Sequence, residues 1–110
     1  MEERYLWEKE YLTIRLPEEL DHAAAEEIRK DVERLMNRNF TRGIIFDFQK
    51  TMFMDSAGIG LIMGRYRALG LRGGCIAAIH VNAYIERMLR ISGVHKYINI
   101  QKEECYGEHE

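Results

Sequence analysis

Short apolar runs alternate with longer segments of helical periodicity along this chain, and this alternation constrains the fold more than any other feature. Residues 12–16 alternate apolar and polar side chains, as a strand with one buried face does. The runs at 44–48 and 75–81 are typical of strands buried on both faces, and residues 97–100 form a last short run. Residues 5–7 are expected to pair with 12–16 as a hairpin.

Helical periodicity separates these runs. Apolar residues recur at helical spacing over 24–36 and 59–69, and Asn82 is placed to cap a third helix that Ser92 and Gly93 end. Strands that alternate with helices in this order require parallel neighbours joined by right-handed crossovers. We therefore expect an α/β fold, in which helices pack on a mixed, mostly parallel sheet of about four to five strands.

Length and composition predict an ordinary globular domain. The chain has 110 residues, of which 46% are hydrophobic and 31% charged, with a single proline. Such a chain buries enough apolar surface to fold and is unlike a disordered segment. We expect a single domain over 1–110, with its core at about 10–100 and a frayed C-terminal tail at 103–110.

Charge and hydropathy exclude two classes of partner. The net charge of −2 supplies no field that would hold the chain on nucleic acid. Arg65, Arg67 and Arg72 are interpreted as the solvated face of a helix and its exit loop rather than as a basic patch. The apolar stretches are shorter than the ~20 residues of a membrane span, so no membrane association is expected.

The cysteines indicate the compartment. Cys75 and Cys105 lack CxxC spacing, and no secretory hydrophobic region precedes them. Cys75 is interpreted as a small core residue and Cys105 as part of a polar tail. A reducing, cytoplasmic location is therefore expected.

A serine lies where an apolar run meets a helical segment, in the stretch FMDSAGIG at 53–60. A nucleophile elbow requires glycine two residues before the serine, and Met54 occupies that place before Ser56. Four histidines can be placed neither beside this serine nor at metal-ligand spacing: His22, His80, His95 and His109. His80, inside a strand, is interpreted as a core residue. The residues do not favour a hydrolase or a metal site.

The glycines after the serine resemble part of a dinucleotide-binding fingerprint. Met63 stands where the third glycine would be, and residues 76–81 contain no acid to bind a ribose, so no cofactor is expected. Gly58 and Gly60 are interpreted as permitting a tight turn, and Gly64 as permitting close packing on the sheet.

Helix capping is a further local interpretation of this stretch. Either Asp55 or Ser56 is placed to accept an amide proton at the start of the second helix. Capping by itself would explain these residue types.

Three longer elements resemble one known family. These are DFQKTMFMDSAGIGLIMGRY at residues 47–66, ELDH at 19–22, and the Ser92-Gly93 pair that ends the third helix. Together they resemble the anti-sigma factor antagonists, which are single STAS domains of bacterial partner-switching systems. The resemblance covers about residues 10–100 in order.

This resemblance implies a binding protein without enzymatic activity. Ser56 is expected to be phosphorylated by an anti-sigma factor that is also a serine kinase, and to be reset by a PP2C-type phosphatase. The unphosphorylated domain would bind the anti-sigma factor and free the sigma factor, and phosphorylation would release it. We expect a monomer or weak dimer whose partner-binding residues are Asp21, His22, Asp55, Ser56, Ala57 and Gly58.

Some residues leave alternatives open. Ala57 stands where many relatives carry a second phosphoacceptor, which leaves Ser56 alone at this place. Residues 103–110 lack apolar periodicity where relatives begin a last helix. Met52 and Phe53 are interpreted as core at a strand end, or as part of a docking surface. The alternative function is a STAS scaffold in a stress-sensing complex, in which Ser56 is only a cap.

Overall fold

The computed structural model describes residues 3–71 and 73–102. Within them, the expected alternation of strands and helices is confirmed. The expectations for Arg72, Cys105, His109 and the tail at 103–110 lie outside the described residues.

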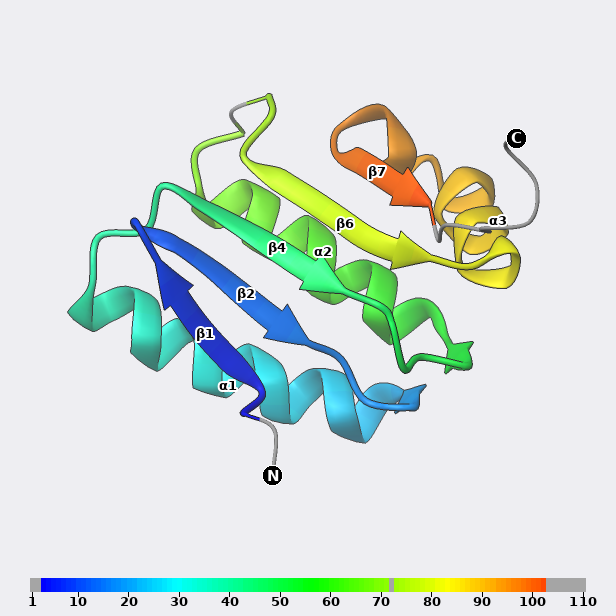
Figure 1. The fold of residues 1–110 in the computed structure, drawn as a ribbon, viewed down its shortest axis with the longest axis horizontal. Coiled ribbons are helices and arrows are strands. Elements are labelled where there is room, and N and C mark those ends of the chain that lie inside the picture. The colour runs from blue at the N-terminus through cyan, green and yellow to red at the C-terminus, as the bar shows by residue number, and fades with distance from the viewer. Residues whose placement is uncertain (1–2, 72, 103–110) are drawn as a thin grey trace, which may run out of the picture.

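A five-stranded sheet forms the centre of the fold, with strand order β1-β2-β4-β6-β7 (Figure 1). The first two strands form the expected antiparallel hairpin, and every other neighbouring pair is parallel. The predicted mixed, mostly parallel sheet is therefore confirmed. The strands are β1 (Tyr5–Glu8), β2 (Tyr11–Arg15), β4 (Gly43–Asp47), β6 (Ile76–Val81) and β7 (Asn99–Lys102).

The helices connect successive parallel strands. They are α1 (His22–Arg38), α2 (Ser56–Ala68) and α3 (Ala83–Ser92), followed by a short 3-10 turn, η1 (Val94–Lys96). Asn82 caps α3 by accepting from the amide of Ile85 at 2.8 Å, and Gly93 ends it with φ +86°, as the sequence predicts.

Each crossover advances to the next strand in the same direction, so the right-handed rule puts the helices on one face of the sheet. Figure 1 shows α1 and α2 side by side on that face. The burial of β4 follows from this arrangement: Ile44 and Phe46 are fully buried, whereas Ile45 between them is half-buried. The expectation that this strand is buried on both faces is therefore wrong.

The core lies between the helices and their face of the sheet. Ile28 of α1 and Ile62 of α2 are fully buried there, together with Leu12 and Ile14 of β2. Arg65 of α2 is also buried, with 7% of its surface exposed, and its expected place on a solvated helix face is wrong.

The predicted environment of His80 is also wrong. It lies at an irregularity in the pairing of β6 with β7, with φ +57° and 46% of its side chain exposed. Its Nδ1 is 2.8 Å from Oδ1 of Asp47, at the end of β4. The histidine is therefore satisfied by a carboxylate at the carboxyl end of β4 and is not a core residue.

Two very short strands were not expected from the sequence. β3 (Glu19–Leu20) and β5 (Phe53–Met54) form a separate parallel pair in which Leu20 lies opposite Met54. Each leads directly into a helix, β3 into α1 and β5 into α2. The pair therefore holds the N-termini of the two helices next to each other.

Candidate functional site at two adjacent helix N-termini

The two strand-to-helix corners have nearly the same backbone. Asp21 precedes α1 with φ −96° and ψ −171°, and Asp55 precedes α2 with φ −106° and ψ −170°. Oδ1 of Asp21 accepts from the amide of Ala24 at 3.0 Å, and Oδ1 of Asp55 accepts from that of Ala57 at 2.8 Å. The Asp55 amide donates to the carbonyl of Leu20 at 3.3 Å, so one backbone hydrogen bond joins the corners.

Ser56 is the first residue of α2 and is exposed. Asp55 performs the capping, which decides between the two candidates for the cap in favour of the aspartate. Among the residues that the structure describes, none forms a hydrogen bond with the Ser56 hydroxyl. The cap of α2 therefore does not depend on this hydroxyl.

Gly58 lets α2 begin close to the short strands. A Cβ at this position would lie 2.6 Å from Cγ of Met54 and 2.9 Å from Cδ2 of Leu20. At Gly60 and Gly64 an added Cβ would meet nothing within 4 Å. All three glycines lie inside α2, so the expected tight turn is wrong, and close packing belongs to Gly58 rather than to Gly64.

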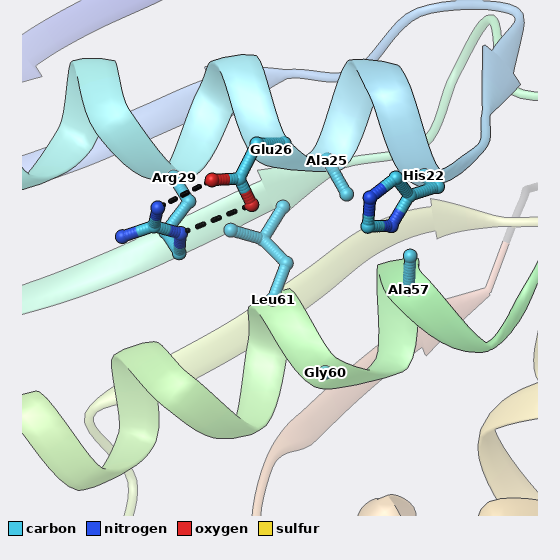
Figure 2. A pocket seen from close by; sticks show the side chains of 7 residues that line it. All are labelled: His22, Ala25, Glu26, Arg29, Ala57, Gly60 and Leu61. Atoms are coloured by element: carbon cyan, nitrogen blue, oxygen red, sulfur yellow. Dashed lines mark hydrogen bonds and ion pairs between the residues drawn. The ribbon is translucent and has the colours of Figure 1, made fainter.

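A groove of about 230 Å³ lies between α1 and α2, next to these corners (Figure 2). The figure shows the imidazole of His22 facing Ala57 across it. Farther along, Arg29 donates to both carboxylate oxygens of Glu26, at 2.5 and 3.3 Å. These hydrogen bonds lower the pKa of Glu26. The lining residues are His22, Ala25, Glu26, Arg29, Ala57, Gly60 and Leu61.

The structure gathers the expected site residues at one edge. Asp21, His22, Asp55 and Ser56 lie at the two joined corners, and Ala57 borders the groove. Gly58 is buried beneath this surface, where it allows α2 to pack closely on Met54 and Leu20.

Sequence reasoning missed five residues of the groove, which are Ala25, Glu26, Arg29, Gly60 and Leu61. On α1, Ala25 and Glu26 lie three and four residues after His22, and Arg29 lies three residues after Glu26, which is the spacing of one helix face. This spacing was the available signal for them. Gly60 and Leu61 gave no such signal, because only the approach of α1 makes their face a groove.

Apolar side chains lie exposed beside the corners. Met52 is 66% exposed and Phe53 is 45% exposed, so their interpretation as core is wrong. Tyr84 of α3 is 40% exposed, and its hydroxyl donates to the carbonyl of Met54 at 3.1 Å. Of these exposed side chains, Phe53 belongs to β5, which leads into the α2 corner, and Tyr84 joins α3 to the same strand.

Comparisons with known proteins identify the family. The STAS domain model matches residues 8–105. The chain belongs to the STAS domain family. This STAS domain is 34% identical over 93 residues to an anti-sigma F factor antagonist of Paenibacillus polymyxa, covering 84% of the present chain and 80% of the relative.

Solved structures show the same fold. The unphosphorylated form of the anti-sigma factor antagonist SpoIIAA matches with a TM-score of 0.76 and 31% identity, over 89% of this chain and 85% of that one. The phosphorylated form of the Bacillus cell fate determinant SpoIIAA matches with a TM-score of 0.68 and 31% identity, over 89% and 88%. The STAS domain described here is thus of the anti-sigma factor antagonist type, as its sequence elements indicated.

Over residues 3–71 and 73–102, no cluster of three histidine, cysteine or acidic side chains is arranged to hold a metal. In the same part of the chain, the structure contains no helix with the length and hydropathy needed to cross a bilayer.

Proposed function

We propose that the corner surface of this STAS domain, formed by Asp21, His22, Asp55, Ser56 and Ala57, binds an anti-sigma factor, and that phosphorylation of Ser56 releases it. The bound anti-sigma factor is the serine kinase, and a PP2C-type phosphatase restores the binding form. In this way the domain controls transcription that depends on the sigma factor.

A contrast between the two serines of the chain carries the proposal. Ser92 donates its hydroxyl to the carbonyl of Leu89 at 2.9 Å and accepts from the amide of Val94 at 3.3 Å, so it serves the end of α3. Ser56 is exposed at the joined corners and has no such role in the described structure. An exposed hydroxyl at the joined corners, which no described residue holds by a hydrogen bond, supports a role in signalling.

The expected energies agree with a switch that leaves the fold intact. A phosphate adds about −1.5 to −2 charge, and the macrodipole of α2 favours it by only ~0.3–1 kcal/mol. At a bound interface the same group would lie beside the carboxylates of Asp21 and Asp55, and leaving it there without a partner costs roughly several kcal/mol. Each ~1.4 kcal/mol changes affinity tenfold, so release requires no refolding.

The test is the intact mass of the protein after incubation with Mg-ATP and the candidate anti-sigma factor from the same genome. We expect one added phosphate on the native chain and on Ser92→Ala, and none on Ser56→Ala. Affinity for the anti-sigma factor should fall by at least tenfold on phosphorylation.

One outcome favours the alternative. Tight binding of the two proteins without any phosphate transfer would exclude the switch for this pair and support a STAS scaffold. A phosphate on Ser56→Ala would place the acceptor elsewhere.

A further inference from the structure

Arg65 is a buried charge that the proposed switch does not use. Residues 3–71 and 73–102 contain three buried polar or charged residues, Thr41, Thr51 and Arg65, and only Arg65 carries a full charge. It projects from α2 toward α1, where Nη2 lies 3.3 Å from Oε2 of Glu33 and Nη1 lies 3.5 Å from Sδ of Met36. Burial lowers the pKa of the Arg65 guanidinium, and Glu33 opposes this effect.

The charges continue from Arg65 to the groove. Oε2 of Glu33 also accepts from Nη1 of Arg29 at 2.8 Å. Arg29 in turn donates to Glu26, and both of these residues line the groove beside the corners (Figure 2). Arg65, Glu33, Arg29 and Glu26 thus form a chain of alternating charges, which we call the charge relay, from the helix interface to the groove beside the corner surface.

Arg65, at the buried end of the charge relay, is the member whose position the fold restricts most. Pairs between exposed side chains three or four positions apart on one helix are weak, and they hold long side chains loosely. The side chain of Arg29 is 39% exposed and that of Glu33 is 45% exposed, whereas that of Arg65 is 9% exposed. Close packing restricts Arg65, so its guanidinium fixes one side of the Glu33 carboxylate and limits the positions open to Arg29.

We propose that Arg65 is a positioning residue for the anti-sigma factor surface, acting through Glu33 to orient Arg29 and Glu26 along the groove. This inference rests on the proposed function for the identity of the partner. The orientation of Arg29 is a property of the free domain and can be measured without any partner.

The experiment compares Arg65→Met with Arg67→Met. Arg67 lies two residues farther along α2 and is exposed, so its removal changes the net charge equally but leaves the relay intact. For each variant, NMR gives the hydrogen-exchange rate of the Arg29 Nε–H, and calorimetry gives the affinity for the anti-sigma factor. Methionine retains the apolar length of the Arg65 side chain beside Met36.

We expect Arg65→Met to speed exchange at Arg29 and to weaken binding by roughly three- to thirtyfold, the range of a remote positioning effect. Arg67→Met should alter neither. Glu33→Gln, at a half-exposed site, breaks the relay one step nearer the groove and should reproduce both changes. It provides a second test of the same contacts if Arg65→Met does not fold. Arg65→Lys retains a cation and should restore part of the affinity.

Two results would overturn the inference, and neither depends on the phospho-switch. Unchanged Arg29 exchange in folded Arg65→Met or in Glu33→Gln would show that Arg65 does not orient it. Native affinity in either variant would show that this orientation does not matter to the partner. If the native chain fails to bind the anti-sigma factor, the proposed function fails, and the exchange rates still decide whether Arg65 positions Arg29.

Discussion

The corner that starts α1 and the corner that starts α2 solve the same structural problem with different residues. Each follows a two-residue strand, and each uses an aspartate with φ near −100° to cap the helix. Backbone geometry therefore explains Asp21 and Asp55 equally well. What it does not explain is the residue after each cap, which is His22 in one corner and Ser56 in the other.

Further differences appear at matching distances from the caps. The third residue after the cap is Ala24 in α1 but Gly58 in α2, and the fifth residue after the cap is Glu26 in α1 but Gly60 in α2. Gly58 is explained by the close approach of Met54, whereas a Cβ added at Gly60 would meet nothing within 4 Å. The two corners therefore contain residues that a contact in the fold explains, such as Gly58, and residues that no such contact explains, such as Gly60 and Ser56.

The largest effect on stability is expected at Gly58, the third residue after the cap of α2. Gly58→Ala should destabilise the domain by about 1–3 kcal/mol, because the added methyl group collides with the buried side chains of Met54 and Leu20. Gly60→Ala should be neutral or stabilising by up to ~1 kcal/mol, because alanine is the better helix former. Urea unfolding of both variants measures the difference, and equal stabilities would refute the distinction drawn between these glycines.

The caps are expected to contribute alike. Asp21→Ala and Asp55→Ala should each cost ~1 kcal/mol, since each leaves an amide at a helix start without its acceptor. Asn substitutions should retain most of this stability, because the amide oxygen also caps. The check is thermal unfolding, where clearly unequal losses would show that the corners are not equivalent. Weaker partner binding by a stable Asn variant would assign a separate role to the carboxylate charge.

The residues after the caps should matter little to folding. His22→Ala and Ser56→Ala are each expected to change the free energy of unfolding by less than ~0.5 kcal/mol, because both side chains are exposed. Chemical denaturation of the two variants provides the measurement. A loss of more than ~1 kcal/mol in Ser56→Ala would mean that the serine has a structural role after all.

The smallest expected difference between the corners is in how stability changes at low pH. Arg29 lowers the pKa of Glu26 from its ordinary 4.5, so the unfolded chain binds the proton first as the pH falls. The stabilisation from this pair is therefore present above about pH 4.5 and is lost as the pH falls through the lower pKa of the folded state. Stability measured against pH in native protein and Glu26→Gln should converge toward low pH. Parallel curves would contradict the assignment, and the α2 corner, with Gly60 at this place, offers no matching group.

The fold was accessible from the sequence wherever a segment was long enough to show a period. The apolar run at 44–48 and the helical spacing over 24–36 both marked elements that the structure contains. The pair β3 and β5 escaped because two residues cannot display a period. Their pairing depends on contacts between segments more than thirty residues apart in the chain, which no local pattern reports.

The site was accessible only in part for a related reason. The aspartates and Ser56 carried local signals, as a cap pattern and as part of a family-like stretch. Arg65 and Arg67 look alike in the sequence, and only the approach of α1 with Glu33 decides that Arg65 is buried. In the same way, Met52 and Phe53 have core-like side chains, and their exposure follows from how β5 is placed.

The short ladder between β3 and β5 has a consequence for how fast and how tightly a partner can bind. Neighbouring strands are about 4.8 Å apart, so the ladder fixes the spacing of the two corners before any partner arrives. A partner that contacts both corners meets a preorganised surface, and little conformational entropy is lost when the complex forms. Such a surface favours rapid rigid-body association, and under the proposed switch a single charged group added at one corner would oppose it.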